Sequence, residues 1–93
     1  MLTIPWSSTS GWGIPKIEPY GPLALDPSST VLHYAPCLFE GMKAYVDKEG
    51  TARLFRPDKN MERMNKSAAR LAFPVRPFIP FLRFLESYSN EFA

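Results

Sequence analysis

Few residues of this chain combine the types and the spacing that catalysis requires. Cys37 and His33 are the single thiol and the single imidazole, a pair that nucleophilic catalysis often uses. Four positions apart in an extended segment, they would be separated by roughly 13 Å, so no Cys–His site is expected. Paired carboxylates fare no better, because Glu40, Asp47 and Glu49 lie on or beside a predicted β-hairpin, where acids usually face solvent.

A metal site and a glycine-rich phosphate loop are not expected either. Structural zinc takes four ligands, mostly Cys and His, and one residue of each type cannot supply them. Gly11 and Gly13 lack both the third glycine and the following helix that a dinucleotide-binding loop needs.

Positive charge is the clearest chemical signal. The net charge is only +2, but seven of the eleven Lys and Arg residues fall between Arg53 and Arg76. On a helix, four of them would lie within about 60° of one another and form a cationic ridge: Lys59, Arg63, Lys66 and Arg70. The ridge is either an ordinary solvated face, with Glu62 and Lys66 as an i,i+4 pair, or an anion-binding surface, for which the planar fork of arginine is well suited.

The elements that would position these residues are a β-hairpin and a helix. Segments 39–46 and 51–55 are rich in apolar and aromatic residues, and Asp47-Lys48-Glu49-Gly50 between them is typical of a turn. Pro57 would end the second strand and open a helix over 58–72. Its apolar stripe comprises Met61, Met64, Ala68, Leu71 and Ala72.

The flanking segments give weaker patterns. Six of the ten prolines precede Cys37, which predicts extended or looped chain there, with short strands over 23–25 and 31–34 separated by a turn at Asp26-Pro27-Ser28-Ser29. A second helix over 80–88 would be apolar on most sides, and so small a chain has little surface to cover it. We therefore expect a partner domain, a second subunit or an unnatural end.

Together these elements predict an α+β fold, with a mainly antiparallel sheet and two helices against one face. Apolar residues at 45% and charged residues at 22% are ordinary globular values. The mixture of Phe39, Tyr45, Phe55 and nearby arginines could suggest an RNA-binding sheet, but the alternation along 39–46 offers no stacking platform, and core packing is the preferred interpretation. Neither nucleic acid nor a membrane is an expected partner.

The chain also resembles a known family. The strings LHYAPCLFEGMKAY at 32–45, RLFRP at 53–57 and NMERM at 60–64 closely resemble branched-chain amino acid aminotransferases, especially those of eukaryotes and fungi. The resemblance runs from about Leu2 to Pro74. It implies fold-type IV, pyridoxal 5′-phosphate as cofactor, a homodimer, and amino transfer between leucine, isoleucine or valine and 2-oxoglutarate.

The resemblance also assigns roles to three residues. Arg63 corresponds to the arginine that binds the cofactor phosphate, while Tyr34 and Phe39 correspond to residues lining the hydrophobic substrate pocket. For Tyr34 and Phe39 simple core packing remains the alternative. No lysine of this chain matches the family's Schiff-base lysine, so no catalytic residue is assigned.

These correspondences lead to an expectation about the whole chain. Residues 1–74 would be part of the small amino-terminal domain of an aminotransferase and 75–93 a divergent helical tail, and the 93-residue chain alone is expected to be inactive. A non-catalytic module that pairs with a full-length subunit, and a fold-type IV enzyme of other chemistry, are the alternatives. No targeting segment is visible, and the cytoplasm or the mitochondrion is the expected location.

Overall fold

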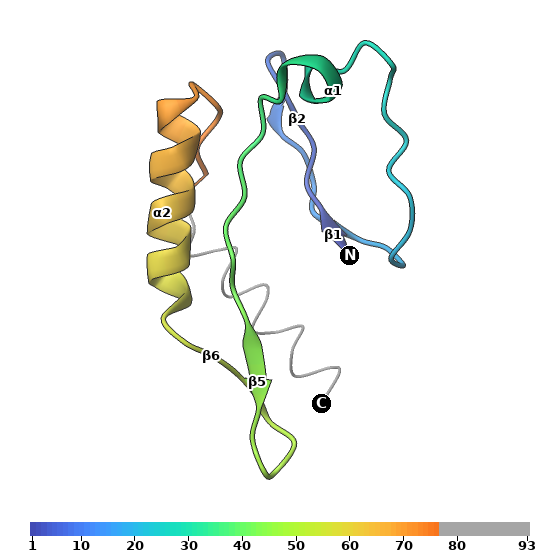
Figure 1. Cartoon of the computed structure of the whole chain (residues 1–93). Coiled ribbons are helices and arrows are strands. Elements are labelled where there is room, and N and C mark those ends of the chain that lie inside the picture. The colour runs from blue at the N-terminus through green and yellow to red at the C-terminus, as the bar shows by residue number, and fades with distance from the viewer. Residues whose placement is uncertain (77–93) are drawn as a thin grey trace. The chain divides into compact units, whose positions relative to one another are not determined.

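The computed structural model describes residues 1–76 (Figure 1). The chain divides into two compact units, Met1–Ala35 and Pro36–Ala93. Within the described residues, all strand pairs are antiparallel and the helices are separate from them in sequence, which confirms the α+β class. The strands form three two-stranded sheets rather than one larger sheet. The predicted helix over 80–88 lies outside the described residues, as does most of the predicted tail.

The first unit begins with two short antiparallel pairs that follow one another along a single hairpin. The outer pair joins β1 (Leu2–Thr3) to β4 (Lys16–Ile17), and the inner pair joins β2 (Trp6–Ser7) to β3 (Gly11–Trp12). The two tryptophans, Trp6 and Trp12, lie directly opposite each other. The extended chain expected here is therefore paired with itself.

Two local features allow this hairpin to close. Ser7 Oγ accepts a hydrogen bond from the Ser10 backbone at 3.1 Å, and Gly11 takes a φ of +70°, which costs glycine little. At Gly13 the facing strand is so near that an added Cβ would lie 2.9 Å from Pro5 Cγ. The polar stretch between the tryptophans is thus a turn, and Gly13 permits close approach of the two strands.

The strands expected over 23–25 and 31–34 are both wrong. Residues 23–25 have no regular structure, and Thr30–Tyr34 forms the short helix α1. The turn before it is as expected, since Asp26 Oδ1 accepts hydrogen bonds from the backbone and hydroxyl of Ser28 at 2.8 and 2.6 Å. This turn redirects the chain into a helical turn, and that overrides the β preference of Val31 and Tyr34.

The predicted hairpin of the second unit is confirmed, although its strands are shorter than expected. They are β5 (Ala44–Val46) and β6 (Ala52–Leu54), with Tyr45 opposite Arg53. Asp47 Oδ1 accepts the backbone N–H groups of Glu49 and Thr51 at 3.0 and 2.9 Å, and Gly50 takes a φ of +84°. The turn residues therefore act as their types predict.

Helix α2 (Pro57–Arg70) follows directly and begins as predicted. Pro57 stands in the first turn, where its missing N–H costs nothing, and Asp58 adds a negative charge near the positive end of the helix dipole. The preceding residue is unusual. Arg56 lies in the left-handed region at φ +47°, a conformation rarely adopted by a residue other than glycine and disfavoured before proline.

The helix ends two residues earlier than predicted. The Phe73 N–H donates to the Ala68 carbonyl at 2.8 Å and the Ala72 N–H to the Ala69 carbonyl at 3.1 Å, which is a Schellman termination with Ala72 at φ +55°. Of the expected apolar stripe, Met61 and Ala68 are buried and Met64 is half-buried. Leu71 and Ala72 follow the last helical residue and are exposed.

Little of the described chain forms a core. Met61 and Ala68 are its only buried apolar side chains. Phe39, Tyr45 and Phe55 are 90%, 62% and 78% exposed, so the expected packing of these aromatics in a core is wrong for residues 1–76. No helix within this range has the length and apolar character to cross a lipid bilayer.

Candidate functional site

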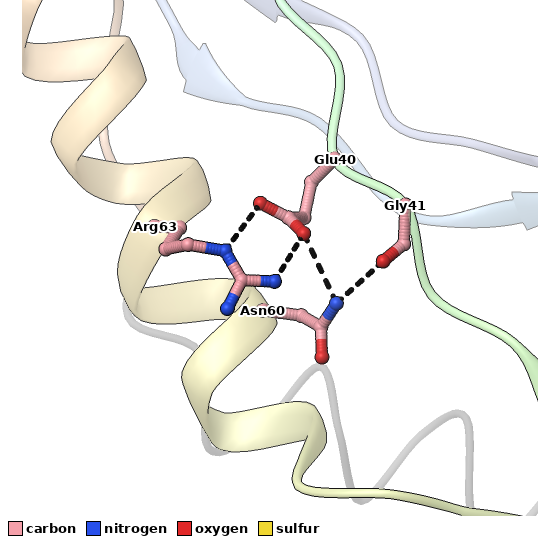
Figure 2. A network of polar contacts seen from close by, with 4 residues as sticks. All are labelled: Glu40, Gly41, Asn60 and Arg63. Carbon is pink, nitrogen blue, oxygen red and sulfur yellow. Dashed lines mark hydrogen bonds and ion pairs between the residues drawn. The ribbon is translucent and has the colours of Figure 1, made fainter.

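The most specific polar contact of the second unit joins Arg63 to Glu40. Arg63 lies on α2 and Glu40 in the segment that precedes β5 (Figure 2). The guanidinium donates from Nη2 to Oε1 at 2.6 Å and from Nε to Oε2 at 3.1 Å. Two parallel charge-assisted hydrogen bonds of this kind fix the relative orientation of both groups.

Asn60, one helical turn before Arg63, completes the contact. Its Nδ2 donates to Glu40 Oε1 at 3.0 Å and to the carbonyl oxygen of Gly41 at 2.6 Å, as Figure 2 shows. Asn60 is the one buried polar residue among those described. Residues 60 and 63 lie on the same face of a helix, so a single face of α2 holds the segment 40–41.

This network also changes the acidity of its charged members. The hydrogen bond from Arg63 lowers the pKa of the Glu40 carboxyl below its ordinary value of 4.5, and the bond from Asn60 lowers it further. The same hydrogen bond raises the pKa of Arg63. Glu40 is thus a carboxylate, and Arg63 a cation, throughout the neutral range.

Arg63 also borders a hollow of about 650 Å³, a volume typical of small-ligand sites. Four cations line it: Lys43, Arg56, Lys59 and Arg63. Its other lining residues are two aromatic residues, Tyr45 and Phe55, together with Gly41, Met42 and Asn60. Cations beside aromatic rings form a surface suited to a planar anion.

The charges around the hollow are only partly neutralised. Lys59 Nζ lies 2.7 Å from Glu62 Oε2, and Arg63 is paired with Glu40. Within residues 1–76, neither Lys43 nor Arg56 forms an ion pair with an acid. Two positive charges are therefore left over, enough to match a dianion such as a phosphate monoester.

The hollow divides the predicted cationic ridge. Lys59 and Arg63 border it, whereas Lys66 and Arg70 do not. The expected pairing of Glu62 with Lys66 is replaced by Lys59–Glu62, three residues apart instead of four. The anion-binding interpretation therefore suits the amino-terminal half of the ridge, Lys59 and Arg63, which borders the hollow. The solvated-face interpretation suits the carboxyl-terminal half, Lys66 and Arg70, which is exposed.

The other predicted site residues lie elsewhere. Phe39 is 90% exposed and is not among the residues that line the hollow. Tyr34 is the last residue of α1 in the first unit and is 82% exposed. Core packing within the described chain does not account for either ring.

Sequence reasoning missed Glu40 and Asn60. Glu40 was expected to face solvent beside a hairpin, but its side chain is only 13% exposed and is held by α2. The usable signal was the pair Asn60 and Arg63 at i,i+3 on the helix, a spacing that lets both side chains reach one carboxylate. Their acceptor lies 20 or more positions earlier, and no local pattern links it to them.

Comparison with known proteins supports the sequence resemblance. The chain is 65% identical over 75 residues to the mitochondrial branched-chain-amino-acid aminotransferase of Saccharomyces cerevisiae, covering 81% of this chain and 19% of that protein. It is 57% identical over 75 residues to the cytosolic enzyme of the same yeast, covering 81% of the chain and 20% of that protein. It is also 47% identical over 74 residues to branched-chain-amino-acid transaminase 1 of Bacillus subtilis, covering 80% of this chain and 21% of that protein. No protein-family model matches the chain.

These identities are far above those of proteins that share a fold alone. Over the matched segment, about four fifths of the chain, the sequence is similar to those of the branched-chain-amino-acid aminotransferases. The predicted resemblance is therefore confirmed. The chain spans about a fifth of the length of these relatives.

Proposed function

We propose that this chain forms the part of a branched-chain amino acid aminotransferase that binds the phosphate group of pyridoxal 5′-phosphate. In the complete enzyme the reaction would transfer an amino group between leucine, isoleucine or valine and 2-oxoglutarate. The names of the relatives support the reaction class. The relatives include mitochondrial and cytosolic forms, and we propose one of these compartments for this protein.

The observation that carries the proposal is Arg63 at the edge of a hollow lined by four cations. An arginine can donate two N–H groups to two phosphate oxygens at once. Nearby Arg56 and Lys43 would add unneutralised positive charge, which attracts a dianion. The donor set therefore fits a phosphate monoester, and the rings of Tyr45 and Phe55 fit a planar aromatic group beside it.

In such an enzyme the cofactor supplies the electron sink for the transamination chemistry. The residues of this chain would bind and orient it: Arg63 would hold the phosphate, and the other cations would raise the local concentration of the anion. Tyr34 and Phe39 are each proposed to contact the aliphatic substrate, as the family resemblance implies, and each ring is exposed. A homodimer is the proposed assembly.

Cofactor binding by the 93-residue chain tests this function. Binding of pyridoxal 5′-phosphate and of pyridoxal, which lacks the phosphate, would be compared by absorbance titration. The proposal requires tighter binding of the phosphorylated form, and Arg63→Ala should weaken that binding by about tenfold or more through the loss of charge-assisted hydrogen bonds. Arg70→Ala, on the same helix but away from the hollow, is the matched control. Equal binding of both compounds, or an unchanged affinity in Arg63→Ala, would overturn the assignment.

A second candidate function is favoured by the exposed aromatic residues. Phe39 and Phe55 are 90% and 78% exposed, an arrangement typical of surfaces that pack against another polypeptide. The chain could accordingly be a non-catalytic module that associates with a full-length aminotransferase subunit. Co-purification of the tagged chain with such a subunit would support this function, and loss of association in a Phe39→Ser, Phe55→Ser variant would assign it to this surface.

A further inference from the structure

Glu40 contacts one particular edge of the Arg63 guanidinium, the edge formed by Nε and Nη2. Its two oxygens accept from Nε and Nη2, at 3.1 and 2.6 Å. A guanidinium has five N–H donors, of which this contact uses two. None of the hydrogen bonds described for residues 1–76 engages Nη1. The edge formed by the two terminal nitrogens, which is also able to make a two-point contact with a phosphate, is left available.

Glu40 is itself held in place. Its side chain is 13% exposed, against 58% for that of Arg63, and Oε1 also accepts from Asn60 at 3.0 Å. The Nδ2 of Asn60 in turn donates to the Gly41 carbonyl at 2.6 Å. The carboxylate thus belongs to a network that includes the buried Asn60, and the guanidinium is its most exposed side chain; Figure 2 shows the contacts that join these residues.

A fixed guanidinium binds an anion better than a free one. An arginine side chain in water samples many rotamers and loses that freedom when it binds. Where a carboxylate already fixes the side chain, most of this rotamer entropy is lost before the anion binds. The negative charge of Glu40 has the opposite effect on affinity, because it repels an incoming phosphate. The uncompensated charges of Lys43 and Arg56 border the same hollow and offset that repulsion.

We propose that Glu40 is a positioning residue for phosphate binding: through Nε and Nη2 it orients Arg63 so that the remaining edge of the guanidinium receives the phosphate oxygens. This inference rests on the proposed function and adds the residue that orients the phosphate ligand. If Glu40 only neutralised charge, its removal would tighten phosphate binding. If Glu40 positions Arg63, its removal should weaken phosphate binding. The direction of the change in phosphate affinity therefore distinguishes the two roles.

The experiment is Glu40→Gln in the 93-residue chain, with affinities measured for pyridoxal 5′-phosphate, pyridoxal and inorganic phosphate. The variant gains one unit of positive charge, which by itself would tighten phosphate binding about threefold. Loss of the charge-assisted contact should instead weaken binding of the two phosphate-bearing ligands by about three- to tenfold. Pyridoxal should bind equally to both chains, a result that a general loss of structure would not give.

Glu62→Gln is the matched control, since Glu62 is also a carboxylate paired with a cation that lines the hollow. Because Lys59 binds as a point charge and needs no fixed edge, this change should leave phosphate affinity the same or slightly higher. If Glu40→Gln also tightens or preserves binding, Glu40 is not a positioning residue. If Arg63→Ala has no effect, the proposed function fails first, and the inference fails with it.

A measurement on the unsubstituted chain removes any dependence on how the variant folds. The Nε–H of Arg63 gives its own signal in ¹⁵N-detected NMR of an arginine-labelled chain. The proposal requires that this proton remain protected from solvent exchange when inorganic phosphate is added, because Glu40 keeps its edge. Faster exchange on phosphate binding would mean that the anion displaces Glu40, and would overturn the proposal.

Discussion

Arg63 and Glu40 illustrate how much of a site is decided by single side chains. The arginine is exposed and the carboxylate is not, so the network is asymmetric: one member is fixed by the fold and the other is available to a ligand. The distances of 2.6 and 3.1 Å define which edge of the guanidinium is used. The ion pair between Glu40 and Arg63 therefore depends on Glu40 being deprotonated.

The pKa of Glu40 predicts an acid-dependent loss of stability. Because the carboxyl's pKa is lowered in the folded chain from 4.5, its ion pair stabilises the fold fully above pH 4.5. That contribution is lost as the pH falls through the lower, folded-state pKa. We expect the midpoint of urea unfolding to fall from pH 5 to pH 3 more steeply in the unsubstituted chain than in Glu40→Gln. Asp26, Asp47 and Glu62, whose pKa values are also lowered, remain in both chains, so parallel curves would contradict the prediction.

Arg56 predicts an opposition between stability and ligand binding. It lies at φ +47° before a proline and lines the hollow, and left-handed backbone costs a residue with a Cβ about 1 kcal/mol. Arg56→Gly should relieve this strain and stabilise the chain by about 0.5–1 kcal/mol, yet weaken binding of pyridoxal 5′-phosphate through the loss of one cation. Urea denaturation and absorbance titration of one variant measure both effects. Strain kept at a binding site is typical of functional residues.

At the scale of elements, helix α2 provides the control for Arg56. Ala72 occupies the left-handed position of the Schellman termination at φ +55°, where glycine is usual. Ala72→Gly should stabilise the chain by about 0.5–1 kcal/mol with no change in cofactor binding, because Ala72 is not among the residues that line the hollow. A destabilised variant in urea unfolding would show that the termination does not limit the stability of α2.

The elements also show which features the sequence predicts. The Asp47–Gly50 turn and the start of α2 at Pro57 follow from residue types adjacent in sequence, and both were predicted. Segment 31–34 was misassigned because its strand-like residues are directed by the preceding turn at Asp26. The Glu40–Arg63 contact joins residues 23 positions apart, and it depends on packing that no local periodicity reveals. The helical spacing placed Arg63 among four cations of a possible anion-binding ridge, and the family resemblance then selected it from the four.

At the scale of the whole molecule, the described chain has too little buried surface for its apolar content. Met61 and Ala68 are buried, while Ile14, Tyr20, Phe39 and Phe55 are each at least 78% exposed. Hydrophobic burial is the main stabilising term in folding. Residues 1–76 therefore leave many large apolar side chains exposed, and the chain spans about a fifth of the length of its relatives.

This exposure predicts self-association of the isolated chain. A net charge of only +2 gives little repulsion between copies, so the exposed rings should drive concentration-dependent assembly. Sedimentation velocity between about 5 and 200 μM should show a rising mean mass, since a weak association is populated only as the protein concentration approaches its Kd. Replacing Phe39 and Phe55 by serine should lower that mass, whereas Leu71→Ser, at a side chain only 45% exposed, should lower it less. A monomer across the whole range would mean that these rings are covered within the chain itself, and the case for a partner surface at Phe39 and Phe55 would be lost.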